Sequence, residues 1–346
     1  MYEAREQLDI LNELQDYSQV DASKIEGTFE YDVLSSNSIE FAKTEVELEQ
    51  LWKASFIDTS WGEHLTSKTA ELGVLRKAAT KAIVILTIKG TPGRTVPKGS
   101  LFCTFDGFRF TTTEEGIVSS EGVVEVKAEA IKAGAVGNVA AETISSIPIS
   151  IPGIESVNNE KSAYDGFDEE SDESLRQRCL LKVRTPATSG NPYHYLQWAL
   201  EVGGVGQAKV IPLWNGNGTV KVIIIDADNK TASSDLVKTT AEYIENKRPV
   251  GATVTVTSPE PLAIDISADI DGNVSSERVT ADVNAYFRSN GFDIKKVTLA
   301  RIGKILMDTG LVNDYEQLKL NGAEGSVYIG LDQLPVCGMV NLNVIS

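Results

Sequence analysis

The sequence predicts a multidomain α+β protein, with an N-terminal helical region, a small antiparallel β-domain and then two α+β units. Three observations support this fold class. Residues 32–58 contain neither Gly nor Pro and repeat apolar residues at helical spacing, the middle of the chain consists of short β-rich runs, and the rest alternates helical and strand patterns. We place the domains at 1–80, 81–160, 161–260 and 261–346.

Charge sets the N-terminal region apart. The chain has 346 residues, with 32 Lys or Arg against 49 Asp or Glu, which gives a net charge of −17. Residues 1–63 hold 15 acids and four bases, so 4 − 15 = −11 of this charge lies there. A chain this acidic, without a basic patch, does not bind nucleic acid. We also expect no membrane span, because the longest aliphatic runs have four residues, and no secretion signal.

The long helix predicted at 32–58 is apolar over an arc wider than one buried face requires. Leu34, Phe41 and Leu48 are spaced by seven residues, and Trp52 falls on the same stripe. We therefore expect these four residues to pack on helices of neighbouring subunits as well as on their own domain. The alternative is a helix buried within its own domain. A second helix is expected at 60–72.

Residues 81–159 read as a small antiparallel β-domain, because Gly, Pro and Asp-Gly turns separate short β-rich runs. Asp106-Gly107 lies between two such runs and predicts a hairpin with a two-residue type I′ turn.

Residues 165–173 contain six acids in nine positions, which suggests either a cation site or a helix N-terminus. The helix explains the pattern better. Ser171 can cap it, Asp172 and Glu173 stand in its first turn, and Lys182 and Arg184 stand near its end, in the order that the helix dipole favours.

The rest of the chain predicts two α+β units. Asn191-Pro192 begins a helix, and Pro259 and Pro261 mark a boundary between the units. The first unit continues with strands at 205–213 and 219–226, a helix at 234–246 and a strand at 252–257. The second has a strand at 262–270, helices at 276–289 and 299–307, and strands near 315–320, 327–330 and 336–344.

Motifs for catalysis are missing from the sequence. It has no Gly-x-Ser-x-Gly elbow and no phosphate-binding loop, and its three cysteines and two histidines, His64 and His194, do not form a metal-ligand pattern. Asp226-Ala227-Asp228 opens like a calcium loop, but Lys230 occupies the third ligand position, so we expect a turn. We predict no catalytic, cofactor-binding or metal-binding residues.

The middle of the chain resembles the baseplate J family of contractile phage tails and related particles. The matching stretches are ELGVLRKAATKA (71–82), GTPGRTVPKGSLFCTFDGFRFTT (90–112), GAVGNV (134–139), DEESDESLRQR (168–178), RTPATSGNPYHYLQWALEVGGVGQAKVIPLWNGNGTVKV (184–222) and RPVGA (248–252). The resemblance covers roughly residues 60–260 and is looser toward the C-terminus.

This resemblance implies a structural protein of the baseplate wedge, not an enzyme. It would assemble in the bacterial host cytoplasm into the tail of a virion or phage-like particle. Its partners would be other wedge proteins, further copies of itself in a sixfold ring and, indirectly, the hub and spike. Two alternatives stay open. One is a β-rich cell-surface or carbohydrate-binding module, suggested by residues 81–159, and the other is a cell-wall hydrolase, suggested by the many carboxylates.

Overall fold

The computed structural model describes residues 2–185, 188 and 190–345. It divides into two compact units. The helical unit comprises Met1–Arg76 and Glu170–Arg184, and the sheet unit comprises Lys77–Glu169 and Thr185–Ser346. The chain therefore leaves the helical unit after Arg76 and returns to it at Glu170. Helices and strands both contribute widely, which confirms the α+β multidomain class with a helical N-terminal region.

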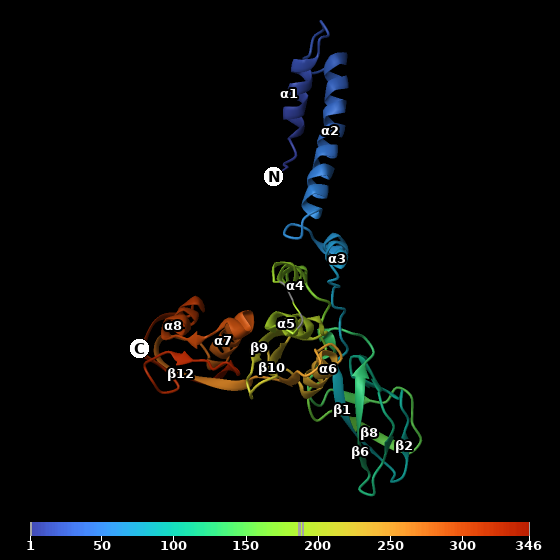
Figure 1. Ribbon diagram of the computed structural model, residues 1–346, viewed down its shortest axis with the longest axis vertical. Helices are drawn as coiled ribbons and strands as arrows, with labels where there is room; N and C mark the ends of the chain where they lie inside the picture. The colour runs from blue at the N-terminus through green and yellow to red at the C-terminus, as the bar shows by residue number, and fades with distance from the viewer. Residues whose placement is uncertain (1, 186–187, 189, 346) are drawn as a thin grey trace. The chain divides into compact units, whose positions relative to one another are not determined.

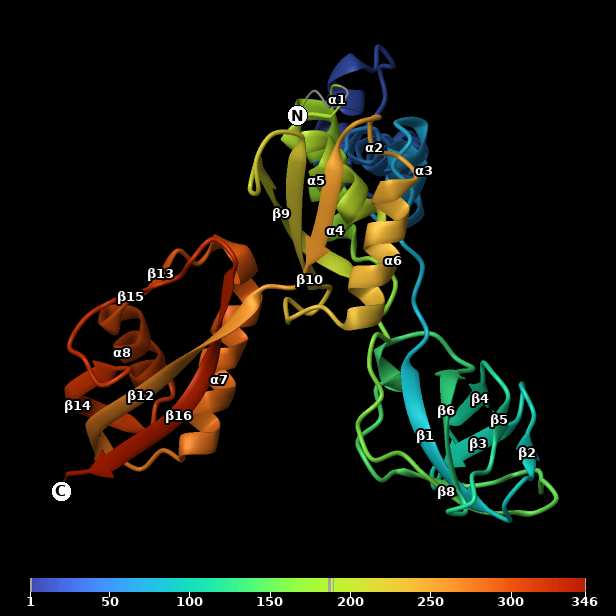
Figure 2. The same ribbon diagram turned by 60° about the horizontal axis from the view of Figure 1, so that its bottom comes forward.

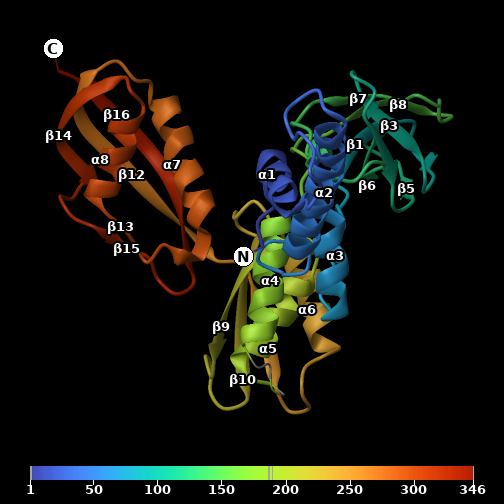
Figure 3. The ribbon, with the colours of Figure 1, turned by 90° about the horizontal axis from the view of Figure 1, so that it is seen from above.

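The helical unit contains α1 (Gln7–Tyr17), α2 (Phe29–Ala54), α3 (Gly62–Glu71) and α4 (Asp172–Arg184). Figures 1 and 3 show α1 lying beside α2. The predicted long helix is confirmed, although it starts at Phe29 because the side chain of Thr28 caps it by accepting the backbone N–H of Tyr31. The predicted second helix is confirmed as α3, and the helix after the acidic run is confirmed as α4.

A six-stranded antiparallel sheet forms the first part of the sheet unit, with the order β7-β3-β4-β6-β1-β8. Its long strands are β1 (Ile83–Gly90) and β6 (Val123–Ala130), which pair side by side. The others are β3 (Leu101–Thr104), β4 (Arg109–Thr112), β7 (Ile144–Ser146) and β8 (Ile154–Asn158), and β2 (Thr95–Val96) and β5 (Gly116–Ile117) form a separate ribbon. The short helix η1 spans Ala135–Gly137. The two end strands β7 and β8 approach each other, so the sheet is nearly a barrel around a core with Phe102 and Phe110 (Figure 2).

The β3–β4 hairpin is present, but its predicted turn is wrong. Around a three-residue loop, Thr104 donates its N–H to the carbonyl of Phe108 at 3.0 Å, and Phe108 donates its N–H to the hydroxyl of Thr104 at 3.1 Å. Gly107 donates its N–H to the carbonyl of Thr104 at 3.0 Å. Gly107 has φ 81°, whereas Asp106 is not among the residues with positive φ, as a type I′ turn would require. The loop is therefore a type I turn followed by a left-handed glycine, the usual three-residue hairpin.

The central part of the sheet unit contains α5 (Pro192–Glu201), β9 (Val205–Pro212), β10 (Thr219–Asp226), α6 (Ser234–Glu245) and β11 (Thr253–Thr257). The strands form a sheet with the order β11-β10-β9, and the helices contact it. One core includes Tyr195 and Ile224, which belong to α5 and β10. Ile223 and Ile225 point to the opposite face of β10 and join a second cluster with Phe292 and Leu334.

The C-terminal part begins with β12 (Glu260–Gly272), which runs between β14 (Val312–Leu320) and β16 (Gln333–Val344). The other elements are α7 (Ser276–Asn290), η2 (Gly291–Asp293), β13 (Lys296–Val297), α8 (Leu299–Asp308) and β15 (Val327–Tyr328). Alternate residues of β12, from Ile264 to Ile270, enter a core that also includes residues of α7 and α8. The strand begins earlier than expected because Pro261 pairs with β16 on one edge only, so its missing N–H removes no bond to β14. No helix among the described residues is long and apolar enough to cross a membrane.

Candidate interaction interface

Helix α1 covers only a narrow strip of α2. Ile10 and Leu11 of α1 are both 3 % exposed, whereas Ser38 is the only residue of α2 that is buried. The hydroxyl of Ser38 accepts a hydrogen bond from Gln7 Nε2 at 2.7 Å. The two helices thus share a small, partly polar contact, and most of the apolar surface of α2 stays uncovered.

Acidic side chains of α2 hold the segment that precedes α1. Glu49 accepts the backbone N–H of Ala4 at 3.0 Å, and Glu45 accepts the backbone N–H of Arg5 at 2.9 Å. The guanidinium of Arg5 also contacts Glu45 and Glu13. Its hydrogen bonds hold the pKa of the Glu45 carboxyl below the usual range. These ion pairs are partly exposed, so they contribute little to the stability of the fold and mainly fix the path of the chain.

The four residues predicted for the interface lie on α2 with different degrees of exposure. Phe41 and Leu48 are 52 % and 47 % exposed. Leu34 and Trp52 are half-buried, and the ring of Trp52 lies 4.8 Å from that of Phe56. Together they form an apolar stripe that no other part of the helical unit fully covers.

A second apolar face lies on the other side of the contact with α1. At about 100° per residue, Ile39 and Val46 are turned away from Phe41, with Ser38 between the two faces. They are 44 % and 48 % exposed and line a groove of about 680 Å³ together with Ala42 and the segment Ala4–Gln7. The wide apolar arc read from the sequence is therefore split in two by α1.

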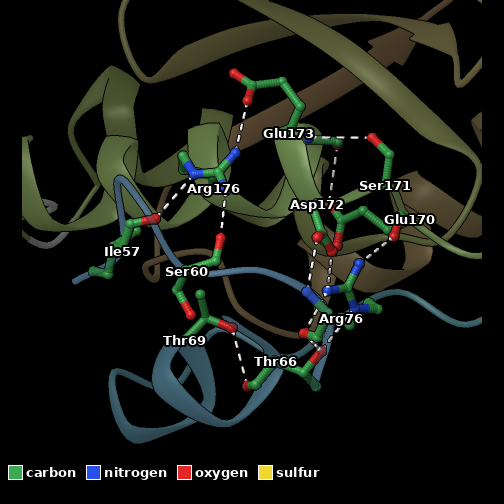
Figure 4. A network of polar contacts seen from close by, with 12 residues as sticks. Ile57, Ser60, Thr66, Thr69, Arg76, Glu170, Ser171, Asp172, Glu173 and Arg176 are labelled. Atoms are coloured by element: carbon green, nitrogen blue, oxygen red, sulfur yellow. Dashed lines mark hydrogen bonds and ion pairs between the residues drawn. The ribbon is translucent and has the colours of Figure 1, made fainter. Parts of the chain in front are cut away.

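A network of arginine contacts joins α3 and α4, below the pair of helices α1 and α2 in the chain of the helical unit (Figure 4). Arg76 donates to the hydroxyl of Thr66 at 2.8 Å, to the carbonyl of Glu170 at 2.6 Å and to the carboxylate of Asp172 at 2.6 Å. Asp172 also accepts the backbone N–H of Gly62 at 2.8 Å, and these bonds hold the pKa of its carboxyl below the usual range. The first half of α3 and the start of α4 are tied to each other through one guanidinium.

Helix α4 also binds the segment that links α2 to α3. Arg176 donates to the carbonyls of Ile57 and Ser60 at 2.9 and 2.6 Å. Arg178 makes two bonds with Glu170, at 2.9 and 2.6 Å, and the side chains are 10 % and 3 % exposed. Helix α4, which follows the barrel in the sequence, thus holds the segment that links α2 to α3.

The sequence did not identify this arginine network. Its signal was the run DEESDESLRQR, but Arg176 and Arg178 also bind backbone carbonyls more than 100 residues earlier in the chain, where no local pattern indicates them. The two histidines pack against tryptophans, His64 on Trp61 and His194 on Trp198, at ring distances of 5.4 and 4.0 Å. Among the described residues, no group of three or more His, Cys, Asp or Glu is arranged to hold a metal ion.

Two family descriptions match the sheet unit. The Baseplate J-like protein barrel domain matches residues 85–166, and the Baseplate J-like central domain matches residues 187–258. Three relatives extend the similarity over more of the chain. The phage-like element PBSX protein XkdT of Bacillus subtilis is 33% identical, with 92% of this chain and 91% of the relative covered.

The protein YqbT of the same bacterium is 32% identical over 99% of both chains. The baseplate protein gp47 of Escherichia phage Mu is 27% identical, with 70% of this chain and 72% of the relative covered. The similarity to XkdT and YqbT includes the N-terminal helices and the C-terminal sheet, which the two family descriptions leave out.

Proposed function

The chain belongs to the baseplate J-like family, and from this membership we propose that it is a wedge component of a contractile-tail baseplate. It is a structural component of the baseplate of a phage tail or phage-like particle. The finer role is that it links wedges into a ring around the central hub and spike and relays the rearrangement that triggers sheath contraction. Such a relay is a change of interfaces and needs no catalytic site.

The observation that carries this proposal is the uncovered apolar surface of α2. Seven large apolar residues of this helix are exposed: Phe29, Val33, Ile39, Phe41, Val46, Leu48 and Leu51. The stripe with Phe41 and Leu48 is one of the two exposed apolar faces that α1 leaves on this helix, and such a face is characteristic of a binding site for another protein chain. We propose that the stripe of Leu34, Phe41, Leu48 and Trp52 packs on helices of neighbouring wedge subunits.

Acidic residues around the stripe favour partners of opposite charge. Although Glu45 and Glu49 are paired with Arg5 and Lys53, residues 1–63 keep a net charge of −11. Like-charge repulsion opposes the pairing of this surface with a second copy of itself. The partner helix should therefore carry Lys or Arg beside its own apolar stripe.

A non-enzymatic role agrees with the environment of the buried carboxyls. Glu170 is paired with Arg178, and Asp226 accepts backbone N–H groups within a turn. We propose that the protein acts only by binding other tail proteins, and that assembly takes place in the host cytoplasm.

Replacing Phe41 and Trp52 by Ala tests the interface. Each substitution should weaken co-purification with the neighbouring wedge proteins by about 2 kcal/mol or more, because large aromatic residues dominate interface energies. Phe41 is half exposed in the free chain, so Phe41→Ala should leave its thermal melt almost unchanged. Phe105→Ala is a matched control, since Phe105 is 93 % exposed on the β3–β4 hairpin.

The outcome against the interface is also clear. If both α2 substitutions lower the melting temperature of the free chain but leave partner binding per folded molecule unchanged, α2 is a core helix and the interface assignment is wrong.

A further inference from the structure

Within the sheet unit, side-chain contacts join the barrel to the central part, because the chain does not pass directly from one to the other. After Glu169 the chain enters α4 of the helical unit, and it returns to the sheet unit at Thr185. Among the described residues, the core of the barrel and the core around α5, α6 and the central sheet share no member. The position of the barrel against α6 therefore depends on the few side chains where the two parts meet.

A polar cluster at the start of α6 makes this contact. Lys127 of β6 donates from Nζ to Oδ2 of Asp235 at 2.8 Å, and Tyr164 donates its hydroxyl to the same oxygen at 3.1 Å. Asp165, at the end of the barrel, accepts a hydrogen bond from the hydroxyl of Ser233, which is the N-cap residue of α6. Two carboxylates, one from each part, thus hold the barrel and α6 together.

The electrostatics of the cluster agree with these bonds. The hydrogen bond from Lys127 holds the pKa of the Asp235 carboxyl below its usual range. Burial raises the pKa of Tyr164 to about 12, and Asp235 adds to this shift, so the phenol remains a donor at neutral pH. The side chains of Lys127 and Asp235 are 33 % and 32 % exposed, and a pair screened in this way by water is weak enough to open.

An aromatic ring beside the cluster has the geometry of a pivot. Phe167 is buried, and a Cβ atom on Gly204 would lie 3.0 Å from its ring and 3.3 Å from the side chain of Leu236. The ring therefore rests directly on the glycine backbone. Such an apolar contact has no preferred direction, whereas the hydrogen bonds of the cluster require defined angles.

We propose that the contacts of Asp235 and Asp165 form a latch, and that its release lets the barrel turn against the central part on Phe167. Small polar contacts between parts of a chain permit relative motion, which large apolar interfaces prevent. A partner that binds Lys127 or Asp235 only when they are apart would shift the equilibrium toward the released state. The inference goes beyond the wedge role, because the motion takes place within one free chain.

Fluorescence energy transfer in the full chain measures the distance between the two parts. Dyes are attached at Glu121→Cys in the barrel and Glu242→Cys on α6, two exposed positions, in a chain that also carries Cys103→Ser and Cys337→Ser. The remaining thiol, that of Cys179, is buried. We expect most wild-type molecules to show one distance, that of the latched state.

Charge reversal at the latch should change this distribution. Lys127→Glu faces Asp235 with a like charge and should raise the released fraction at least about tenfold. Lys89→Glu is the matched control, because it makes the same charge change at an exposed position on β1 of the same barrel, and it should keep the wild-type distance. The swapped pair Lys127→Glu, Asp235→Lys restores the attraction and should return most molecules to the latched state.

The second carboxylate is tested separately. Asp165→Gly removes the bond to Ser233 and places glycine at φ 61°, a backbone conformation that glycine adopts without strain, so the variant should fold and raise the released fraction. This variant decides the question if Lys127→Glu does not fold.

The latch is wrong if Lys127→Glu and Asp165→Gly, each folded by circular dichroism, keep the wild-type distance. It is also wrong if Lys89→Glu releases the barrel equally, or if the swapped pair remains released. Phe41→Ala should keep the wild-type distance, so a failure of the α2 interface, seen in co-purification, is distinguished from a failure of the latch.

Discussion

At the scale of single residues, Asp226 shows how a turn can bury a carboxyl without forming a site. It ends β10, is 9 % exposed, and its Oδ1 accepts the backbone N–H groups of Asp228 and Lys230 at 2.9 and 2.7 Å. The turn expected from Lys230 in the third ligand position is confirmed. Burial raises the pKa of Asp226 to about 6 from the ordinary 3.8, although the two hydrogen bonds oppose the shift.

The raised pKa predicts a pH dependence of stability. Between pH 3.8 and about 6 the folded state binds more protons than the unfolded state, so this group stabilises the fold at low pH and stabilises it less as pH rises through that window. Asp226→Asn keeps the accepting oxygen and removes the charge. It should raise the free energy of unfolding at pH 7 by about 1 to 3 kcal/mol, with little change at pH 4.

Urea unfolding at pH 4, 5, 6 and 7 measures this difference. Asp228→Asn, in the exposed part of the same turn, serves as control. An Asp226→Asn variant that is less stable than the wild type at pH 7 would show that the charge itself holds the turn.

At the scale of elements, α4 depends on the bonds of three arginines more than on its own apolar face. Its buried residues are only Leu175 and Cys179, which pack with Leu65 and Val74 in a small cluster. The contacts of Arg76, Arg176 and Arg178 surround this cluster. Removing one member of a buried ion pair leaves an uncompensated charge, which costs far more than the pair contributes.

Arg178→Met should therefore destabilise the helical unit by about 3 to 5 kcal/mol, because Glu170 would remain buried and charged. The double variant Arg178→Met, Glu170→Leu should recover much of this loss. Hydrogen exchange of the α3 and α4 amides measures both effects. Lys304→Ala, which breaks the exposed pair with Asp308 on α8, is the control and should change little. Equal losses in the single and double variants would contradict the ion-pair explanation.

At the scale of the whole molecule, the two units have cores of very different size. The buried cluster of the helical unit contains four residues, whereas the cores of the barrel and the C-terminal sheet contain 13 and 15. Stability against unfolding follows the apolar area that a unit buries. The helical unit should therefore unfold before the sheets.

Cys179 reports on this order, because its thiol is fully buried in the helical unit and burial raises its pKa. In a chain with Cys103→Ser and Cys337→Ser, labelling of Cys179 should begin at a lower urea concentration than the loss of the strand signal in circular dichroism. Coincident midpoints for the two signals would mean that the units unfold together. Labelling in native buffer would show that the thiol is not buried.

The sequence by itself determined the class of the fold and most of its elements. Helix α2, the helices after Ser171 and Asn191, and strands β9 and β10 follow from apolar period, capping residues and turn residues, which act within a few positions of the chain. The family resemblance came from the same local turns and motifs. The apolar stripe through Leu34, Phe41, Leu48 and Trp52 was also visible, because period is a local property.

Only the tertiary structure decided what those elements meet. It grouped α4 with α3, although the barrel separates them in the sequence. It divided the apolar arc of α2 by placing α1 along Ser38, and it left β16 at the edge of its sheet. It also replaced the expected type I′ turn by a three-residue loop at Gly107. The first three depend on packing or pairing between residues that local patterns do not connect, and such contacts form only when the whole chain has folded.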